Sequence, residues 1–292
     1  LPYANAPLHL GHILEHTQTD IWVRFQKLYG NECTYVCADD AHGTPIMLKA
    51  DELSMSPEEL IEMIYKEHKS TFEDFKISHD NYHSTHSNEN KILSERIYKA
   101  LHAKGLIEKK VINQLFDTSR NMFLSDRYVK GTCPNCGAED QYGDNCEICS
   151  ATYNAIDLKD PISVLTGTEP IIKESEHLFF KLSLLKDEIN EWLDTSKIQE
   201  PVRNKLNEWL DADLKDWDIS RDGPYFGFKI PGYDDKYFYV WLDAPIGYLA
   251  SHLNYLIKQD CEKDFEGFWS RDSASEVFHF IGKDIMYFHT LF

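Results

Sequence analysis

The stretch PYANAPLHLGH, residues 2–12, decides the expected fold, because it places two histidines and a glycine where a strand gives way to a helix. The helix that follows is expected to end at Gly30, a residue type that often terminates helices. Its apolar residues recur on one helical face, at Leu14, Ile21, Phe25 and Leu28. The amino end of a helix carries free N–H groups and a partial positive charge, which suit a phosphate group. The stretch therefore predicts a phosphate-binding turn.

Strand and helix signals alternate through the first third of the chain. A β-compatible run over residues 33–38 follows the first helix, and SPEE, residues 56–59, forms a capping box with proline at the first helical position. The helix that it opens is expected to bury Ile61, Ile64, His68, Phe72 and Phe75. A third helix begins near Ser87 and stops at Gly105. This order predicts a parallel sheet with right-handed crossovers.

Four of the seven cysteines fall in two Cys-x-x-Cys pairs, Cys133 with Cys136 and Cys146 with Cys149. Each tight turn brings two thiolates to one side, and two turns close a tetrahedron with no open position, which predicts one structural Zn²⁺. A redox pair is disfavoured because neither pair opens a helix in a thioredoxin-like context. The pattern favours a reducing compartment, so we expect a cytoplasmic protein. The remaining thiols are interpreted as core or incidental, without a role: Cys33, Cys37 and Cys261.

The middle of the chain differs from its two ends. Strands are expected at 111–116 and 177–182 on either side of the cysteine-rich loop, and amphipathic helices around 185–193 and 202–210. Strand signals return at 237–243 and 277–281, the second leading into a helix from Asp284. We therefore expect an α/β fold, in which a Rossmann-like parallel sheet is split by an inserted connective domain with a zinc knuckle.

Three units follow from this pattern. Residues 1–105 form the first half of a nucleotide-binding catalytic domain, and residues 106–235 form the insertion, with the knuckle at about 130–152. Residues 236–292 form the second part of the catalytic domain, which we expect to be truncated. The chain begins without methionine and ends in an apolar stretch, so it is interpreted as a fragment of a longer protein.

Bulk composition limits the classes of partner. The net charge of −19 argues against non-specific binding to nucleic acid, since a phosphate backbone favours a basic surface. No run of eighteen apolar residues occurs, and we expect no membrane partner. Nothing in the sequence indicates an oligomeric state.

The turn at residues 2–12 resembles the "His-Ile-Gly-His" region of class I aminoacyl-tRNA synthetases, with leucine in the second position. In that family the two histidines stabilise the transition state at the α-phosphate while the amino-acid carboxylate attacks ATP. The resemblance assigns this catalytic role to His9 and His12, which would also bind ATP. Gly11 would let the nucleotide approach the backbone closely, and Glu15 would lie on the adenosine side. The resemblance also implies Mg²⁺ with ATP.

Two further stretches resemble the methionyl enzymes of this class. In CADDAHGTP, residues 37–45, the resemblance places Asp40 against the amino group of methionine, at the edge where α/β sheets bind ligands. In WLDAPIGY, residues 241–248, aromatic side chains bracket a small corner, and aromatic walls suit the polarizable sulfur of methionine. The pocket residues carried over are Trp241, Ala244, Pro245 and Tyr248. The alternative interpretation is an aromatic cluster at a strand end that only packs the core.

The opening loop and the last helix complete the expected site. Leu1 and Tyr3 would line the methionine site, and Arg221 is expected to pair with Asp40. In FIGKDI, residues 280–285, the resemblance places two residues by the adenosine ribose, Gly282 and Asp284. Two residues one helical turn apart would finish the side-chain pocket, Ile285 and His289.

The resemblance covers residues 1–292 and includes DQYGDN, residues 140–145, which resembles the knuckle of bacterial-type methionyl enzymes. It implies a methionine--tRNA ligase, which makes methionyl-adenylate and transfers the methionyl group to tRNA(Met). The family's Lys-Met-Ser-Lys-Ser loop and anticodon-binding helices are absent from this chain, so we expect the fragment alone to be inactive in full aminoacylation.

Two alternatives remain open. The first is a related synthetase for leucine, isoleucine, valine or cysteine, which residues 241–248 and the four-cysteine knuckle disfavour. The second is a zinc-dependent nucleic-acid-binding module with a degenerate nucleotide fold, which the negative charge and the paired histidines disfavour. Pyrophosphate exchange tested across the twenty amino acids separates these possibilities.

Overall fold

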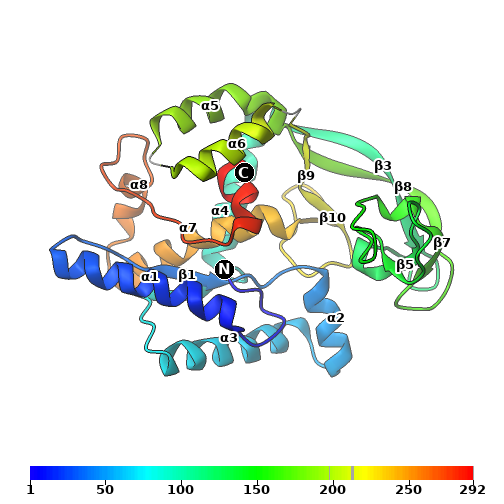
Figure 1. The fold of residues 1–292 in the computed structure, drawn as a ribbon, viewed down its shortest axis with the longest axis horizontal. Helices are drawn as coiled ribbons and strands as arrows, with labels where there is room; N and C mark the ends of the chain where they lie inside the picture. Colours follow the sequence, from blue (N-terminus) through cyan, green and yellow to red (C-terminus); the bar gives the residue numbers. More distant parts are fainter. Residues whose placement is uncertain (197, 212–213, 292) are drawn as a thin grey trace.

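A computed structural model describes residues 1–196, 198–211 and 214–291 of the chain, apart from the side chain of Asp284. The helices of the N-terminal part gather around a small sheet, and a long pair of strands reaches away from them (Figure 1). Within the described residues, no helix combines the length and the apolar composition needed to cross a membrane.

Parallel strands organise the N-terminal part, as the sequence predicts. Helix α1 (Leu10–Tyr29) leads to β1 (Val36–Asp39), and helices α2 (Thr44–Leu53) and α3 (Pro57–Asp74) lead to β2 (Asn81–Ser84). Strand β2 pairs with β1 in parallel and continues into α4 (Asn88–Ala103).

The opening segment extends this parallel arrangement. A parallel bridge joins Tyr3 to Asp40, and the N–H of Asp40 donates to the carbonyl of Pro2 at 2.8 Å. Among the described residues this sheet has two strands and a bridge. The fold is therefore mixed α/β, and the single Rossmann-like sheet that we expected is not formed by the strands described.

Helix α1 buries a different face from the one that its apolar pattern indicated. Leu14 and Phe25 are 60% and 57% exposed, and Leu28 is 88% exposed. The buried residues of the helix are Ile13, His16, Thr19, Asp20 and Val23. The polar members of this face have partners: the Thr19 hydroxyl donates to the Glu15 carbonyl, and Asp20 accepts from the backbone of Ser78. The apolar period identified the helix but selected the wrong buried face.

Helix α3 confirms its predicted start. The Glu59 N–H donates to the Ser56 hydroxyl at 3.1 Å, and the Ser56 N–H donates to the Glu59 carboxylate at 2.8 Å. Its buried residues are Leu60, Ile61, Ile64, His68 and Phe72. Phe75, which was expected in the core, is 53% exposed because the helix has already ended at Asp74.

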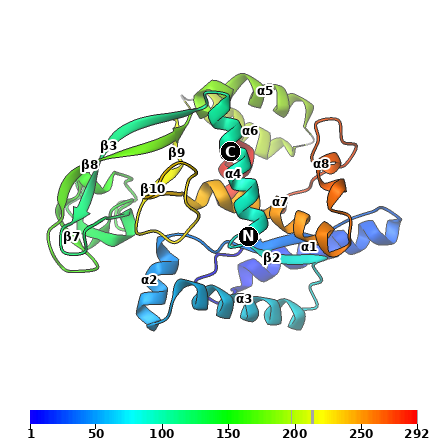
Figure 2. The same cartoon turned by 180° about the vertical axis from the view of Figure 1, so that it is seen from behind.

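Two long antiparallel strands form an arm that carries the cysteines. Strand β3 (Ile107–Asp117) pairs with β8 (Ile171–Phe180) from Ile107 opposite Phe180 to Phe116 opposite Ile171. The flanking strands β4 (Met122–Phe123) and β9 (Trp217–Asp218) complete the sheet in the order β4-β3-β8-β9. Figures 1 and 2 both show β7 at the far end of this arm, and Figure 1 labels β5 beside it.

The end of the arm has its own small sheet and core. The short 3₁₀ turn η1 (Asp126–Tyr128) precedes β5 (Val129–Thr132). Strand β5 lies between β6 (Gln141–Tyr142) and β7 (Lys159–Ser163), with η2 (Ala155–Asp157) before β7. The core residues beneath this sheet are Leu115, Met122, Leu124, Tyr128, Val129 and Leu158.

The chain returns through a second helical layer. The turn η3 (Leu182–Leu185) leads to α5 (Lys186–Thr195) and α6 (Glu200–Asp211). Strand β10 (Ser220–Asp222) then pairs with β11 (Lys236–Phe238) in antiparallel fashion. The larger core lies where these elements meet α4 and β8, around Leu178, Leu182, Leu206, Ile219 and Phe238.

Helix α7 (Val240–Lys258) corrects the strand that we expected at 237–243, because the strand ends at Phe238 and the helix begins two residues later. It packs closely on the β1–β2 sheet: the Ser251 hydroxyl donates to the Cys37 carbonyl at 2.8 Å. A side chain at Gly247 would place its Cβ 2.7 Å from Thr85 and 3.1 Å from Leu1, so this close approach requires glycine.

The last segment also differs from expectation. After η4 (Glu262–Asp264) and α8 (Phe265–Phe268), the expected strand at 277–281 runs without a ladder partner among the described residues. The turn η5 (Lys283–Ile285) then leads to α9 (Met286–Leu291). Helix α9, at the red end of the chain, lies against α7 in Figure 1.

Candidate active site

His9 and His12 form the amino end of α1 together. His9 is the N-cap residue, and its Nδ1 accepts from the backbone N–H of Gly11 at 3.0 Å and of His12 at 3.4 Å. In return, the His9 N–H donates to Nδ1 of His12 at 3.3 Å, and the two rings stack with centroids 3.8 Å apart. Because each Nδ1 accepts, each neutral ring carries its proton on Nε2. The helix start is thus left with two parallel N–H donors.

The electrostatics of this turn favour the neutral form of His12. Burial, with the neighbouring His9 ring, lowers the pKa of His12 to about 4. Gly11 has a local role that the sequence did not indicate, because a Cβ there would lie 2.9 Å from the His9 ring. The glycine makes room for the capping imidazole as well as for any ligand.

Two adjacent aspartates at the end of β1 have opposite surroundings. Asp39 accepts from Nδ1–H of His68 at 2.7 Å and from the Tyr82 hydroxyl. Nε2–H of His68 donates to the Ala6 carbonyl, so this ring donates from both nitrogens and is positively charged. Although burial lowers the pKa of His68, the Asp39 carboxylate raises it above the usual range. The charge of Asp39 is therefore balanced within the protein, although its Oδ2 is buried and has no hydrogen-bond partner.

Asp40 has no such balance. Its Oδ1 is buried and has no hydrogen-bond partner, and none of the ion pairs between described residues includes it. Burial, followed by the nearby carboxylate of Asp243, raises the pKa of Asp40 well above its usual range. A buried carboxylate oxygen without a partner is a position that a cationic group of a ligand would stabilise.

Asp243 and His42 were missed by the sequence analysis, although both lie inside the stretches that it singled out. Asp243, fully buried on α7, accepts from Nδ1–H of His42, and Nε2 of His42 lies 3.0 Å from Nδ1 of His86. The second oxygen of Asp243 has no partner. The Tyr3 hydroxyl donates to the His42 carbonyl at 2.7 Å and fixes this loop.

The helix places the four predicted pocket residues of α7 on one face. Trp241, Ala244, Pro245 and Tyr248 are spaced as i, i+3, i+4 and i+7. As a strand these positions would have pointed to both sides. The correction from strand to helix therefore brings the predicted residues together.

Helix α9 packs against this face. The Tyr248 hydroxyl donates to Nε2 of His289 at 2.9 Å, and Nδ1–H of His289 donates to the Ile285 carbonyl at 2.9 Å. Trp241 lies against the Phe288 ring, with centroids 4.3 Å apart. Burial lowers the pKa of His289 to about 4, so its ring is neutral and orients the tyrosine hydroxyl.

Arg221 does not pair with Asp40 as expected. It donates to Asp218 at 3.0 Å and to the Ser220 carbonyl, and its guanidinium lies 3.7 Å from the centre of the Tyr239 ring. Arg221 on β10 pairs instead with Asp218 at the end of β9, three residues earlier in the chain.

A cavity of about 710 Å³ collects part of the predicted site. Its walls include Leu1, Glu15 and Tyr248, together with His279 and Phe280 from the last segment. Burial raises the pKa of Glu15. Its described walls do not include His9, His12 or Trp241. The two histidines and Trp241 therefore do not line this cavity, although Glu15 on α1 and Tyr248 on α7 do.

The adenosine-side residues of the last segment are less enclosed. Gly282 is exposed and has open space around its Cα. The predicted Asp284 side chain lies outside the described part of the chain.

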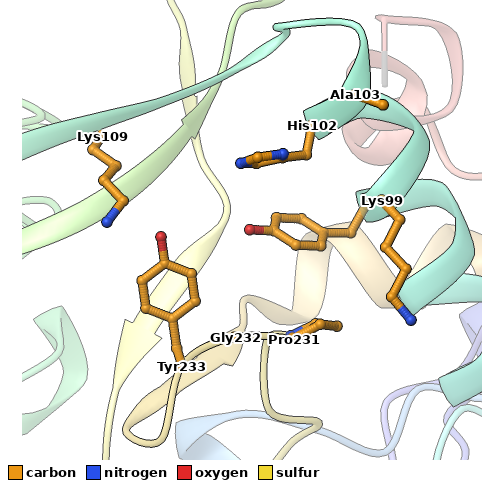
Figure 3. Close-up of a pocket in the computed structure, with 8 residues that line it drawn as sticks. Lys99, His102, Ala103, Lys109, Pro231, Gly232 and Tyr233 are labelled. Carbon is orange, nitrogen blue, oxygen red and sulfur yellow. The ribbon is translucent and has the colours of Figure 1, made fainter.

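A second cavity of about 420 Å³ lies between α4, β3 and residues 231–233, lined by Lys99, His102, Lys109 and Tyr233 (Figure 3). None of the predicted site residues borders it.

The four predicted knuckle cysteines come together at the end of the arm. The sulfurs of Cys133 and Cys149 are 3.9 Å apart and those of Cys136 and Cys146 are 3.6 Å apart. All four ligand atoms lie within 4.8 Å of one another. Ligands around a tetrahedral ion with bonds of about 2.3 Å would be roughly 3.8 Å apart. The cluster could hold such an ion.

The two turns of the knuckle repeat the same backbone geometry. The Cys136 N–H donates to the Cys133 sulfur at 3.5 Å, and the Cys149 N–H donates to the Cys146 sulfur at 3.4 Å. The Asn135 amide donates to Cys149 and lowers the pKa of that thiol to about 6. These donors favour the thiolate form that a metal requires.

The chain belongs to the class I tRNA synthetases, because the family model for "tRNA synthetases class I (M)" matches residues 1–292. Two solved structures share its fold. The crystal structure of Mycobacterium tuberculosis methionyl-tRNA synthetase bound by methionyl-adenylate aligns with a TM-score of 0.72 at 22% identity, covering 100% of this chain and 52% of that one.

The Mycobacterium tuberculosis enzyme in complex with methionyl-adenylate aligns in a second structure with a TM-score of 0.68 at 24% identity, covering 100% of this chain and 51% of that one. The chain thus spans about half the length of the solved structures that it matches.

Proposed function

We propose that this chain carries the methionine-activating site of a methionine--tRNA ligase. The observation that carries the proposal is Asp40, a half-buried residue whose Oδ1 is buried and has no partner, at the carboxyl end of β1. The ammonium group of an amino acid would supply the missing charge and donors. The fully buried Asp243 adds a second negative charge to the same region.

The side-chain pocket would lie on the shared face of α7 and α9. Trp241, Ala244, Pro245 and Ile285 would provide apolar contacts, and the hydrogen bond from Tyr248 to His289 would hold the tyrosine ring against the thioether. Leu1 and Tyr3 would line the amino-acid side of the site. Arg221 would border the site while it is held by Asp218 and the Tyr239 ring.

ATP would bind at the amino end of α1. The Nε2–H groups of His9 and His12 would donate to phosphate oxygens as negative charge develops on them. Gly11 and Glu15, with Gly282 and Asp284, would hold the adenosine side, and Mg²⁺ would neutralise the phosphates. Positioning of the carboxylate beside the α-phosphate would then give methionyl-adenylate, and a terminal hydroxyl of tRNA(Met) would take the methionyl group.

The proposed units follow the expected division. Residues 1–105 and 236–292 would form the catalytic domain, with 106–235 as the insertion. Cys133, Cys136, Cys146 and Cys149 would hold one structural Zn²⁺.

Amino-acid-dependent pyrophosphate exchange, measured on the full-length protein, tests the proposal. Methionine alone among the twenty amino acids should stimulate exchange, and Asp40→Asn should abolish that stimulation. Stimulation by leucine, isoleucine, valine or cysteine instead would assign the chain to a synthetase for that amino acid. Exchange with none of the twenty, together with binding of nucleic acid, would favour the zinc-dependent binding module.

Homocysteine provides a finer test of the pocket. It lacks one methyl group of methionine, and a difference of this size is worth only about 1–3 kcal/mol in an apolar pocket. We expect homocysteine to stimulate exchange with a reduced kcat/KM. A complete lack of stimulation by homocysteine would contradict the pocket described above.

A further inference from the structure

Three side chains that the proposed function does not use converge beneath α1. His16 from α1, Cys37 from β1 and His79 from the loop before β2 each offer one ligand atom, and these atoms lie within 4.8 Å of one another. Nδ1 of His16 is 3.1 Å from Nε2 of His79. His16 and Cys37 are buried, and His79 is half-buried. From the sequence alone Cys37 was interpreted as an incidental thiol.

The local hydrogen bonds leave this convergence only partly explained. Nδ1 of His16 also lies 3.1 Å from the Tyr35 hydroxyl, so a single ring nitrogen meets two partners. A neutral imidazole nitrogen has either one lone pair or one proton. The two contacts therefore share one ring nitrogen, while the ligand atoms of His16, Cys37 and His79 lie close enough together to reach one ion.

We propose that His16, Cys37 and His79 form a second metal site, which takes a thiophilic divalent cation of the Zn²⁺ type. Two imidazole nitrogens and one sulfur suit Zn²⁺ and Co²⁺, whereas Mg²⁺ and Ca²⁺ require oxygen ligands. Three protein ligands leave the fourth position of a tetrahedron for water or the Tyr35 hydroxyl. The site is distinct from the four-cysteine knuckle, which lies at the end of the arm.

Protonation states and dimensions support the site. Burial lowers the pKa of His16 to about 2 and that of His79 to about 4, so both rings are neutral at pH 7. Burial raises the pKa of the Cys37 thiol, so the arriving cation displaces one proton from sulfur to solvent as the metal–sulfur bond forms. Ligands of a tetrahedral zinc ion are roughly 3.3–3.8 Å apart, so no pair of these ligand atoms has to approach by more than about 1.5 Å.

The large cavity gives the ion a path to the site. His16, Tyr35 and Cys37 all form part of the wall of the 710 Å³ cavity. On the other side, His79 is held by ring contacts with Phe72 and Tyr82, with centroids 4.9 Å and 5.0 Å away. Bound metal would therefore join α1, β1 and the approach to β2, and would raise the stability of these elements.

A cobalt titration of the full chain, with zinc already in the knuckle, tests this site without amino acid or ATP. We expect one further Co²⁺ per chain and a thiolate-to-cobalt absorption band. Cys37→Ser should remove the band, and His79→Gln should weaken the affinity at least tenfold. His79→Gln guards against misfolding of the Cys37 variant, because His79 is half-buried.

Matched controls come from the same cavity wall. Cys33→Ser and His252→Gln remove a thiol and an imidazole that border the cavity but do not belong to the cluster, so the band should persist in both. An indicator dye should detect no released zinc, since release would mean that cobalt had entered the knuckle. A total of one ion per chain, or an undiminished band in Cys37→Ser, would overturn the proposal. The binding readout is independent of the proposed function.

Discussion

At the scale of single residues, the two aspartates that follow β1 show how neighbours divide the roles of identical side chains. Each aspartate keeps one buried oxygen without a hydrogen-bond partner, but Asp39 is paired with the protonated His68, whereas Asp40 takes part in none of the ion pairs between described residues. An unbalanced buried charge lowers stability and persists where a ligand supplies the balance. The difference in charge pairing supports the proposal that Asp40 binds the ligand and that Asp39 is structural.

Asp40→Asn should therefore separate stability from binding. The change removes a buried negative charge beside Asp243, so we expect the free energy of unfolding to rise by about 1–3 kcal/mol. Methionine binding should be lost in the same variant, as measured by calorimetry on the full-length protein. Asp39→Asn is the matched control: it should lower stability, because His68 then loses its carboxylate partner. Equal stability losses in both variants would contradict this division.

Several site residues could be predicted from the sequence because they lie in short contiguous stretches. Asp40 and the α7 face belong to this group. The pairing of Asp243 with His42 could not, because the two residues are 201 positions apart. The same limit applied to Arg221: nothing in the sequence showed that it would pair with Asp218.

At the scale of secondary-structure elements, α1 begins with a cap that is also the proposed phosphate site. The same His9 ring accepts two backbone N–H groups through Nδ1 and keeps its Nε2–H for a ligand. Helix stability and phosphate binding therefore use opposite edges of one ring.

Substitutions of His9 should distinguish these two roles. Asparagine is a good N-cap residue but lacks the distant N–H donor, so His9→Asn should retain stability. His9→Ala should lose about 0.5–2 kcal/mol of unfolding free energy through loss of the cap. Both variants should lose roughly 10²–10³-fold in the rate of methionine-dependent exchange, as expected for one transition-state donor. Exchange at the normal rate in His9→Asn would show that the ring serves only as a cap.

The knuckle gives a second prediction at this scale. Its core is small, so metal binding and folding of residues 130–152 should be coupled by something on the order of 10 kcal/mol. A strong chelator should loosen the insertion, which limited proteolysis would detect as cleavage within this segment. A variant with all four cysteines replaced by serine should behave like the chelated protein. Unchanged thermal stability of that metal-free variant would count against the assignment.

Element types were predictable where one signal dominated. The capping box of α3 and the paired Cys-x-x-Cys turns were confirmed because each depends on adjacent residues. The prediction of a strand over residues 237–243 was wrong at its second half. This stretch is rich in β-favouring aromatic residues, but the packing of α7 on β1 and β2 outweighs that preference. The apolar stripe of α1 likewise gave the helix but not its buried face.

At the scale of the whole molecule, buried histidines of opposite character couple stability to pH. Burial lowers the pKa of His289 to about 4, whereas Asp39 raises the pKa of His68 against the effect of burial. In the unfolded chain both rings titrate near 6.5. Between about pH 6.5 and 4 the unfolded state therefore binds more protons at position 289 than the folded state does, while the reverse holds for position 68 above pH 6.5.

The two histidines should thus give opposite pH effects. The stability of the wild type relative to His289→Gln should fall as the pH drops from 6.5 to 4. The stability of the wild type relative to His68→Gln should be greatest below pH 6.5 and should be lost as the pH rises through the folded pKa of His68. Urea unfolding at several pH values measures both differences. Parallel trends for the two variants would refute the protonation states described here.

The antiparallel arm also allows its far end to be removed without a break in the rest of the chain. Because Phe116 lies opposite Ile171 at the last rung of β3 and β8, the chain leaves and re-enters the arm at neighbouring points. A two-residue Asn-Gly turn could join β3 to β8 at this pair and replace the whole segment between Phe116 and Ile171. The trimmed chain could be produced without zinc, provided that Leu48 of α2, which packs against the knuckle core, were made polar. An unrelated domain could be inserted at the same pair of residues in place of the knuckle.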